Sequence, residues 1–215
     1  MPGMAKLSRA EISAAVTDRG WRYVLGSVST SVPAGSLAEA GELAARVAAA
    51  AGPAGTGSVR LDVRADRLVV EVAAEAVSAG GGELIDRIGA VLGEAAGPSP
   101  VQRLEIAIDA LDIPAVLPFW RAVLDYVNEP GSDDSIMDPR GQGPPVWFQQ
   151  MDAPRPQRNR IHFDVSVPHD EAEARIKATL AGGGTLVSAD AAPAFWILAD
   201  PEGNEACICT WQGRD

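Results

Sequence analysis

The feature that most constrains this chain is a strand pattern that occurs twice, 57 residues apart. The segment 160–167 alternates polar and apolar residues, as a strand with one face on a core does. Its polar face is formed by His162, Asp164 and Ser166. The segment 105–110 repeats this pattern, with Glu105 at the position of His162. Each segment precedes a proline, an acidic residue and an amphipathic helical pattern, so the C-terminal half is predicted to be one domain of two similar units.

Each of these units is expected to be β-α-β-β-β. Asp112 is predicted to cap the helix of the first unit and Asp170 that of the second, which should end at Gly182. The strands of the first unit are predicted at 104–110, 126–129, 135–138 and 146–151. Those of the second unit are predicted at 161–167, 185–188, 194–198 and 205–211.

The N-terminal half has a different order of elements, α-β-β-α-β-β-α. Ser8 and Glu11 form a capping-box pattern at the first helix, and Ser36 should cap a helix over 37–51. Strands are predicted at 21–25, 27–32, 59–63 and 67–72, and a last helix at 83–95. The proline-bearing segment 97–102 is predicted to be a linker. We therefore expect an α+β protein with domains at 1–97 and 103–215.

Charge and cysteine content restrict the compartment and the partners. The formal net charge is −11, and residues 100–215 hold nine basic against eighteen acidic residues. Such an acidic surface lacks the clusters of Lys and Arg residues with which proteins bind nucleic acids. The sequence has no run of about 18 apolar residues, and its N-terminus lacks the apolar stretch of a secretory signal. Cys207 and Cys209 would lie about 6.6 Å apart on one strand face, an awkward geometry for a disulfide, so a reducing cytoplasmic location is expected.

Three segments of the C-terminal half resemble the vicinal-oxygen-chelate superfamily, which includes glyoxalase I, extradiol dioxygenases and bleomycin-resistance proteins. They are Asp112 with Pro118–Leu124, Asn159–Val165, and Ala199–Cys207, the last containing Asp-Pro-Glu-Gly-Asn. The resemblance covers about residues 103–211 and is greatest to small bacterial glyoxalase-like domains. It implies that two βαβββ units curl around one shared pocket.

The same resemblance implies positions for metal ligands on the pocket side. Enzymatic members place two ligands in each unit, which here correspond to Glu105, Gln149 or Gln150, His162 and Cys207. A neutral amide is a poor ligand and a thiolate favours softer metals, so Glu105 and His162 are the metal ligands predicted if a divalent ion is bound. Glu205, on the face of Cys207, is a substitute. The alternative is a structural His162 that is hydrogen-bonded to Glu105 or Asp164.

Aromatic residues near the ends of the predicted sheets suit a planar ligand, although such residues also form cores. They are Trp147, Phe148, Phe195, Trp196 and Trp211. The predicted ligand-binding set comprises Glu105, Trp147, Gln149, Gln150, His162, Asp164, Trp196 and Cys207. The Pro/Arg segment 152–159 is either a lid or a simple connection between the units. No catalytic residue is assigned.

The N-terminal half, with Gly20–Arg22 after its first helix, resembles pterin-4a-carbinolamine dehydratase. That family's active site carries a histidine pair before the third strand and another histidine after the fourth. Here Gly57 and Ser58 stand at the pair, and Glu75 at about the third. Dehydration needs proton transfer near neutral pH, for which imidazole is suited, and no histidine precedes His162. We expect an inactive dehydratase-like domain that serves in dimerisation or docking.

Three functions follow as hypotheses. The first is a metal-independent, glyoxalase/bleomycin-resistance-like protein that binds a small molecule. The second is a metal-dependent lyase, isomerase or dioxygenase of the same superfamily, in which the ion would polarise two neighbouring oxygens of the substrate. The third is pterin binding or a residual dehydratase role of the N-terminal domain. Both resembling families form oligomers, so a homodimer is expected, with neither nucleic acid nor membrane as a partner.

Overall fold

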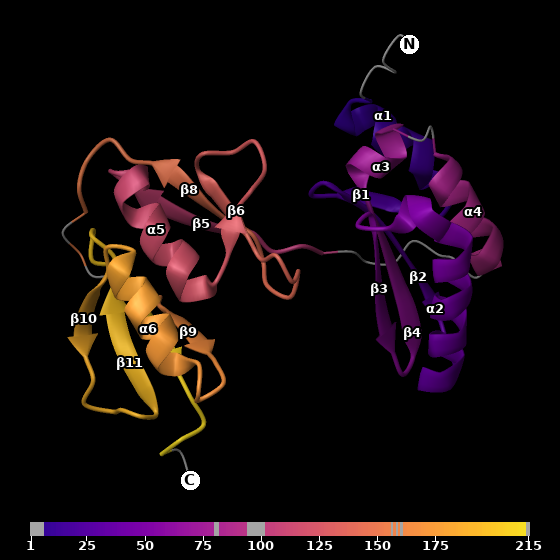
Figure 1. The fold of residues 1–215 in the computed structure, drawn as a ribbon. Helices are drawn as coiled ribbons and strands as arrows, with labels where there is room; N and C mark the ends of the chain where they lie inside the picture. Colours follow the sequence, from indigo (N-terminus) through magenta and orange to yellow (C-terminus); the bar gives the residue numbers. More distant parts are fainter. Residues whose placement is uncertain are drawn as a thin grey trace. The chain divides into compact units, whose positions relative to one another are not determined.

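The computed structural model describes residues 7–79, 82–93, 102–155, 157, 159 and 161–213. The chain divides into two compact units, Met1–Arg103 and Leu104–Asp215, which carry the indigo-to-magenta and the pink-to-yellow elements of Figure 1. Most of the linker predicted at 97–102 lies outside the described residues. No described helix is long and apolar enough to cross a membrane.

The first unit contains one antiparallel sheet in the order β1-β2-β4-β3. Its strands are β1 (Arg22–Val24), β2 (Ser27–Pro33), β3 (Val59–Arg64) and β4 (Arg67–Ala73). Its helices are α1 (Arg9–Thr17), α2 (Leu37–Ala51), the short 3₁₀ helix η1 (Gly52–Gly55), α3 (Ala74–Ala79) and α4 (Glu83–Leu92). Helices α2 and α4 pack against each other, and the core is closed by the fully buried Trp21 and the inward residues of β2 and β4.

The caps predicted for this unit are confirmed. Ser8 and Glu11 form a reciprocal capping box on α1, and the Ser36 side chain accepts a hydrogen bond from the Glu39 N–H at the start of α2. Helix α3 was not predicted, because β4 passes into it with no glycine or proline to mark the change. Helix α4 ends at Leu92, before Gly93 at φ +65°, a left-handed backbone angle that favours glycine.

The positions that correspond to the dehydratase histidines lie near one end of the β3–β4 pair, where the Ser58 carbonyl accepts a hydrogen bond from the Ala73 N–H at 2.8 Å. Gly57 and Ser58 lie in the turn before β3, and Glu75 is exposed in α3. The dehydratase-like identity of this unit stays a prediction.

The second unit repeats one arrangement twice, as predicted. The first repeat comprises β5 (Ile106–Ala110), α5 (Ile113–Leu124), β6 (Val127–Asn128), β7 (Ser135–Met137) and β8 (Val146–Gln150). The second comprises β9 (Phe163–Ser166), α6 (Ala172–Ala181), β10 (Thr185–Ser188), β11 (Phe195–Ala199) and β12 (Glu205–Cys209). Their sheets have the equivalent orders β5-β8-β7-β6 and β9-β12-β11-β10. In each repeat the first strand pairs in parallel with the last, and the other pairs are antiparallel.

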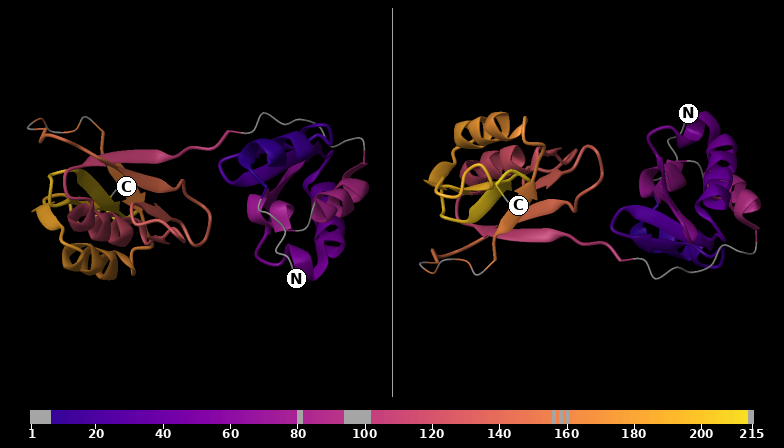
Figure 2. Two further views of the ribbon diagram at one scale, coloured as in Figure 1. Left: turned by 90° about the horizontal axis from the view of Figure 1, so that it is seen from above. Right: turned by 90° about the horizontal axis from the view of Figure 1, so that it is seen from below.

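The two repeats share one core beneath α5 and α6, which lie side by side in both views of Figure 2. The Trp120 ring of α5 meets the Phe163 ring of β9 edge-on, with 5.4 Å between their centroids. Phe163, Val165 and Val167 pack against this core, which confirms the alternation predicted for the segment. At Gly182 a Cβ would lie 2.7 Å from the carbonyl oxygen of Pro118, so the end of α6 approaches α5 more closely than alanine would allow.

Several predicted boundaries are shorter in the structure. Strand β5 begins at Ile106 and β9 at Phe163, so Glu105 and His162 each stand just before a strand. Asp112 caps α5 by accepting a hydrogen bond from the Ala115 N–H, as predicted. The prediction that Asp170 caps α6 is wrong: Glu171 holds the N-cap position, without a side-chain hydrogen bond. The Glu171 N–H donates to the Pro168 carbonyl, so a turn precedes this helix and delays its start.

The turn at Asp200–Asn204 joins the second repeat to the first. Asp200 is 3% exposed, and its carboxylate accepts hydrogen bonds from the Trp120 indole N–H at 2.9 Å and from the Asn204 amide at 2.8 Å. The backbone N–H groups of Glu202 and Asn204 also donate to it. The Glu202 carboxylate accepts from the N–H groups of Leu111 and Asp112 at 2.7–3.0 Å. One turn thereby binds a tryptophan within α5 and the backbone at the start of that helix.

Replacing Asp200 with alanine should lower the free energy of unfolding of the second unit by about 2–4 kcal/mol, because it leaves buried N–H donors without an acceptor. Chemical denaturation followed by tryptophan fluorescence measures the loss. Asp190→Ala, at an exposed aspartate, is the matched control and should change stability by less than about 0.5 kcal/mol. Equal stabilities of the two variants would contradict the role assigned to Asp200.

Candidate functional site

Strand β9 separates two hollows in the second unit, because successive side chains of a strand point to opposite faces. Ile161 and Phe163 line one hollow, of about 820 Å³, which we term the first hollow. His162 and Asp164 line the other, of about 710 Å³, which we term the second hollow. Glu205 of β12 borders both.

The first hollow combines an apolar floor with a polar rim. The floor is formed by Ile106, Ile108, Trp120 and Phe163. The rim comes from the segment between the repeats (Met151, Arg155, Gln157, Asn159 and Ile161), from β5 (Asp109) and from the turn that precedes β12 (Glu202, Gly203 and Asn204). Asn159 and Asn204 are hydrogen-bonded through their side-chain amides, which joins the two parts of the rim.

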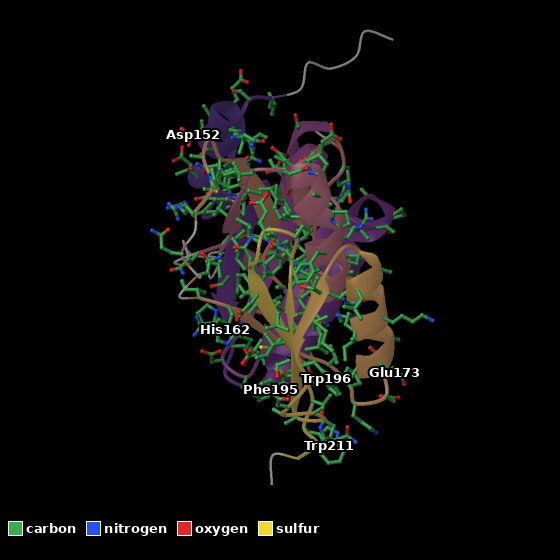
Figure 3. The ribbon with its side chains drawn as sticks, turned by 90° about the vertical axis from the view of Figure 1, so that its left-hand side faces the viewer. Asp152, His162, Glu173, Phe195, Trp196 and Trp211 are labelled. Atoms are coloured by element: carbon green, nitrogen blue, oxygen red, sulfur yellow. The ribbon has the colours of Figure 1, made fainter. Side chains whose placement is uncertain are left out.

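The second hollow brings together three side chains of different donor chemistry. Ligand atoms of His162, Asp164 and Cys207 all lie within 4.8 Å of one another. The His162 Nε2 is 3.4 Å from the Asp164 Oδ1, and Asp164 stands directly opposite Cys207 in the parallel pair β9–β12. His162 and Asp164 are exposed, whereas Cys207 is 6% exposed. Figure 3 shows His162 on the opposite side of the sheet from Glu173 of α6.

The environment of the Cys207 thiol suppresses its ionisation. Burial and, after it, the hydrogen bond to the Asp164 carboxylate raise the pKa of Cys207 to about 12. Both causes disfavour the thiolate, since it would be poorly solvated and would face a like charge. The thiol is therefore protonated at neutral pH and is a poor nucleophile as it stands.

The structure gathers three of the eight residues predicted to bind a ligand, His162, Asp164 and Cys207, in the second hollow. Glu105 is exposed and does not join this group. His162 has Asp164 beside it, which is one of the two partners considered for a structural histidine.

The other predicted residues have separate environments. The Gln150 amide donates to the carbonyls of Leu111 and Met151 at 2.8 and 2.9 Å, which ties it to backbone. Gln149 is exposed beside Asp109, and Trp147 is half-buried in β8. Trp196 packs against the core.

Sequence reasoning did not find the lining of the first hollow. None of the eight predicted residues borders it. The sequence feature that pointed toward this hollow was the Pro/Arg segment 152–159, which was interpreted as either a lid or a simple connection. Polar loops between repeats often carry function. Among the other aromatic candidates, Phe148 is buried in the core and Phe195 lines the second hollow, whereas Trp211 is exposed beside His169.

Because Asp164 helps to raise the pKa of Cys207, it should slow the alkylation of this thiol. In a Cys209→Ser background, the rate of alkylation of Cys207 should rise with pH without reaching a plateau below about pH 11, because its pKa is about 12. Asp164→Asn removes the charge that helps to raise this pKa, so more thiolate should be present at about pH 9 and alkylation should be faster. Mass spectrometry with iodoacetamide measures both rates. Identical pH profiles would contradict the contribution of Asp164.

Comparison with known protein families finds a match within the second unit. Residues 105–209 match the model of a family described as "Glyoxalase-like domain". No curated protein matches the chain.

Several solved structures are similar to part of the chain. A glyoxalase-related enzyme from Fulvimarina pelagi is 19% identical, with a TM-score of 0.41 over 51% of this chain and 87% of that one. A glyoxalase/bleomycin resistance protein/dioxygenase family enzyme from Burkholderia phytofirmans is 18% identical, with a TM-score of 0.41 over 49% and 95%. The oxidase ChaP-H2 is 17% identical, with a TM-score of 0.39 over 52% and 94%. The two βαβββ repeats of the second unit lie within residues 105–209, the part of the chain that matches the glyoxalase-like domain model.

Proposed function

We propose that the glyoxalase-like domain binds a small organic molecule in the first hollow without the help of a metal ion. The observation that carries this proposal is the composition of the hollow. Small-molecule sites usually enclose about 300–1,000 Å³ and combine apolar walls with a few polar groups that fix orientation. The first hollow, at about 820 Å³, has both features.

The lining favours a ligand with a compact apolar body and polar groups at one end. The rings of Trp120 and Phe163 and the side chains of Ile106 and Ile108 offer an apolar floor. Hydrogen-bonding groups occur at the rim, where the amides of Gln157 and the Asn159–Asn204 pair stand near charged side chains. A planar metabolite with carbonyl, amide or hydroxyl substituents fits this division.

The carboxylates of the first hollow support metal-independent binding. Glu202 uses its oxygens to accept backbone hydrogen bonds at the start of α5. Among the residues that the structure describes, Asp109 and Glu205 do not form a metal-capable group with it. The polar rim is therefore proposed to act by hydrogen bonding and by charge.

For the first unit we propose a role without dehydratase activity. No histidine precedes His162, and Glu75, at the position of one family histidine, is an exposed side chain of α3. The unit keeps a buried core around Trp21 without these histidines, and the role we propose for it is docking or dimerisation.

A pair of variants tests ligand binding in the first hollow. Ile161 lines the rim of the hollow and is 77% exposed, so Ile161→Asp should leave the fold intact while replacing an apolar side chain of the rim with a charged one. Leu186→Asp on β10 introduces the same change at an exposed position away from the hollow. A panel of planar aromatic fragments, screened by ligand-observed NMR and titrated by tryptophan fluorescence, is the probe.

Fragments that bind the unmodified protein should bind Leu186→Asp equally well and Ile161→Asp about tenfold more weakly, the effect of about 1.4 kcal/mol of lost apolar contact. Retention of binding in Ile161→Asp, or the absence of any binding fragment, would overturn the proposal.

A further inference from the structure

The first hollow lies along a free edge of a sheet, which narrows the chemistry of its ligand. Strand β5 is the outermost strand in the order β5-β8-β7-β6, and four of its five residues, Ile106 to Asp109, line the hollow. We propose that the backbone of β5 at Ala107 recognises a cyclic amide, a planar heterocycle with neighbouring N–H and C=O groups in its ring. This inference rests on the proposed binding function and names the class of ligand for it.

The pairing of β5 with β8 decides which backbone groups face the hollow. The Ile106 N–H donates to the carbonyl of the residue before β8, and the Ala110 carbonyl accepts from the N–H of the residue after it. In a parallel pair every second residue directs both of its backbone groups to the neighbouring strand, so Ile106, Ile108 and Ala110 direct theirs to β8. Ala107 and Asp109 therefore direct theirs to the free edge.

These outward backbone groups have no partner among the residues that the structure describes. Strand β5 pairs with β8 alone, and neither Ala107 nor Asp109 takes part in the backbone hydrogen bonds formed outside the strand pairs. Ala107 is exposed and lines the hollow, so its N–H and C=O are open to a ligand there. The free edge of a strand is a template for a further hydrogen-bonded group.

A cyclic amide matches the groups that one outward residue of a strand presents. In an antiparallel sheet such a residue exchanges two hydrogen bonds with a single residue of its neighbour, one through its N–H and one through its C=O. A cyclic amide carries the complementary donor and acceptor side by side. Its N–H would donate to the Ala107 carbonyl, and its C=O would accept from the Ala107 N–H.

The apolar floor lies on the side of the sheet where a flat ligand needs it. Ile106 and Ile108 project from one face of β5. They pack in the same core as Trp120 and Phe163. A ring that lies in the plane of the sheet, with its amide edge at Ala107, would have one face over this floor. The hydrogen bonds and the apolar contact are compatible, because they use the edge and the face of the ring.

The surroundings of the edge favour a small molecule over an added strand. The outward part of β5 is short, with Ala107 and Asp109 alone, and the hollow beside it is bordered by the turn 202–204 and by the segment between the repeats. Its volume of about 820 Å³ is in the range of small-molecule sites. The exposed Asp109 carboxylate, two residues along the edge, offers a further acceptor for an N–H of the ligand.

Three probes of similar size separate the contribution of the edge from that of the floor. 2-Quinolinone carries the cyclic amide, N-methyl-2-quinolinone lacks its donor, and naphthalene has the apolar rings alone. Titration of the full-length protein, followed by ¹H–¹⁵N NMR, measures their affinities. 2-Quinolinone should bind about tenfold more tightly than either of the others, the gain from the hydrogen bonds at the edge. The Ala107 amide proton should move downfield with 2-quinolinone and not with naphthalene.

The variant Ala107→Pro removes the outward N–H and leaves the pairing with β8 in place. Proline is tolerated on an edge strand where the lost N–H does not belong to the ladder. The variant should bind 2-quinolinone about tenfold more weakly than the unmodified protein does. Its affinity for naphthalene should stay within about twofold, since the floor is unchanged, and this probe reports whether the hollow is intact.

The outcomes distinguish this inference from the proposed function. Equal affinities of 2-quinolinone and naphthalene for the unmodified protein would overturn the cyclic-amide assignment, and so would bound 2-quinolinone that leaves the Ala107 amide proton in place. Either result leaves ligand binding in the first hollow standing. If none of these probes and no other aromatic fragment binds, the proposed function fails as well. The NMR measurement on the unmodified protein decides the matter even if Ala107→Pro does not fold.

Discussion

The buried carboxylate of Asp200 is the contact on which the second unit most depends. It accepts hydrogen bonds from the indole of α5 and from its own turn, and its charge is spread over donors that would otherwise lack partners. These hydrogen bonds join the turn before β12 to α5 of the first repeat. The edge-on contact of Trp120 with Phe163 forms at the same junction, and the core continues from one repeat into the other.

The repeats and most of their elements could be predicted because they depend on local patterns. The alternation in 160–167 and its recurrence at Glu105 define two strands whatever surrounds them, and Asp112 is a cap by virtue of its own helix. The prediction that Asp170 caps α6 was wrong because an acidic residue after a proline also suits a turn. The hydrogen bond from the Glu171 N–H to the Pro168 carbonyl shows that the segment is a turn. Helix α3 has no signal at its start.

The candidate site was less predictable because it depends on pairing between distant segments. The sequence alone indicates that Cys207 and Glu205 share a strand face. The position of Cys207 opposite Asp164 follows only from the register of β9 and β12. The equivalence of Glu105 and His162 is correct as a repeat position, yet it does not place their side chains together. For the first hollow, part of the rim comes from the segment between the repeats, which has no periodicity, so that sequence offers only its composition.

Strand β9 gives the domain two chemically distinct faces from one short stretch. Its apolar side chains complete the core and the floor of the first hollow, while Asp164, and His162 just before the strand, line the second. A change of register by a single residue would exchange these roles. The parallel pairing with β12 and the ring of Phe163 in the core fix this register.

The turn that fastens the repeats together also supplies Glu202, Gly203 and Asn204 to the first hollow. Ligand binding in the first hollow and the association of the two repeats are therefore linked. A molecule that contacts this turn only while the turn is packed against α5 binds the associated repeats in preference to separated ones. A ligand of the proposed kind would stabilise the joined repeats by mass action, so the free energy of unfolding of the domain would rise with ligand concentration.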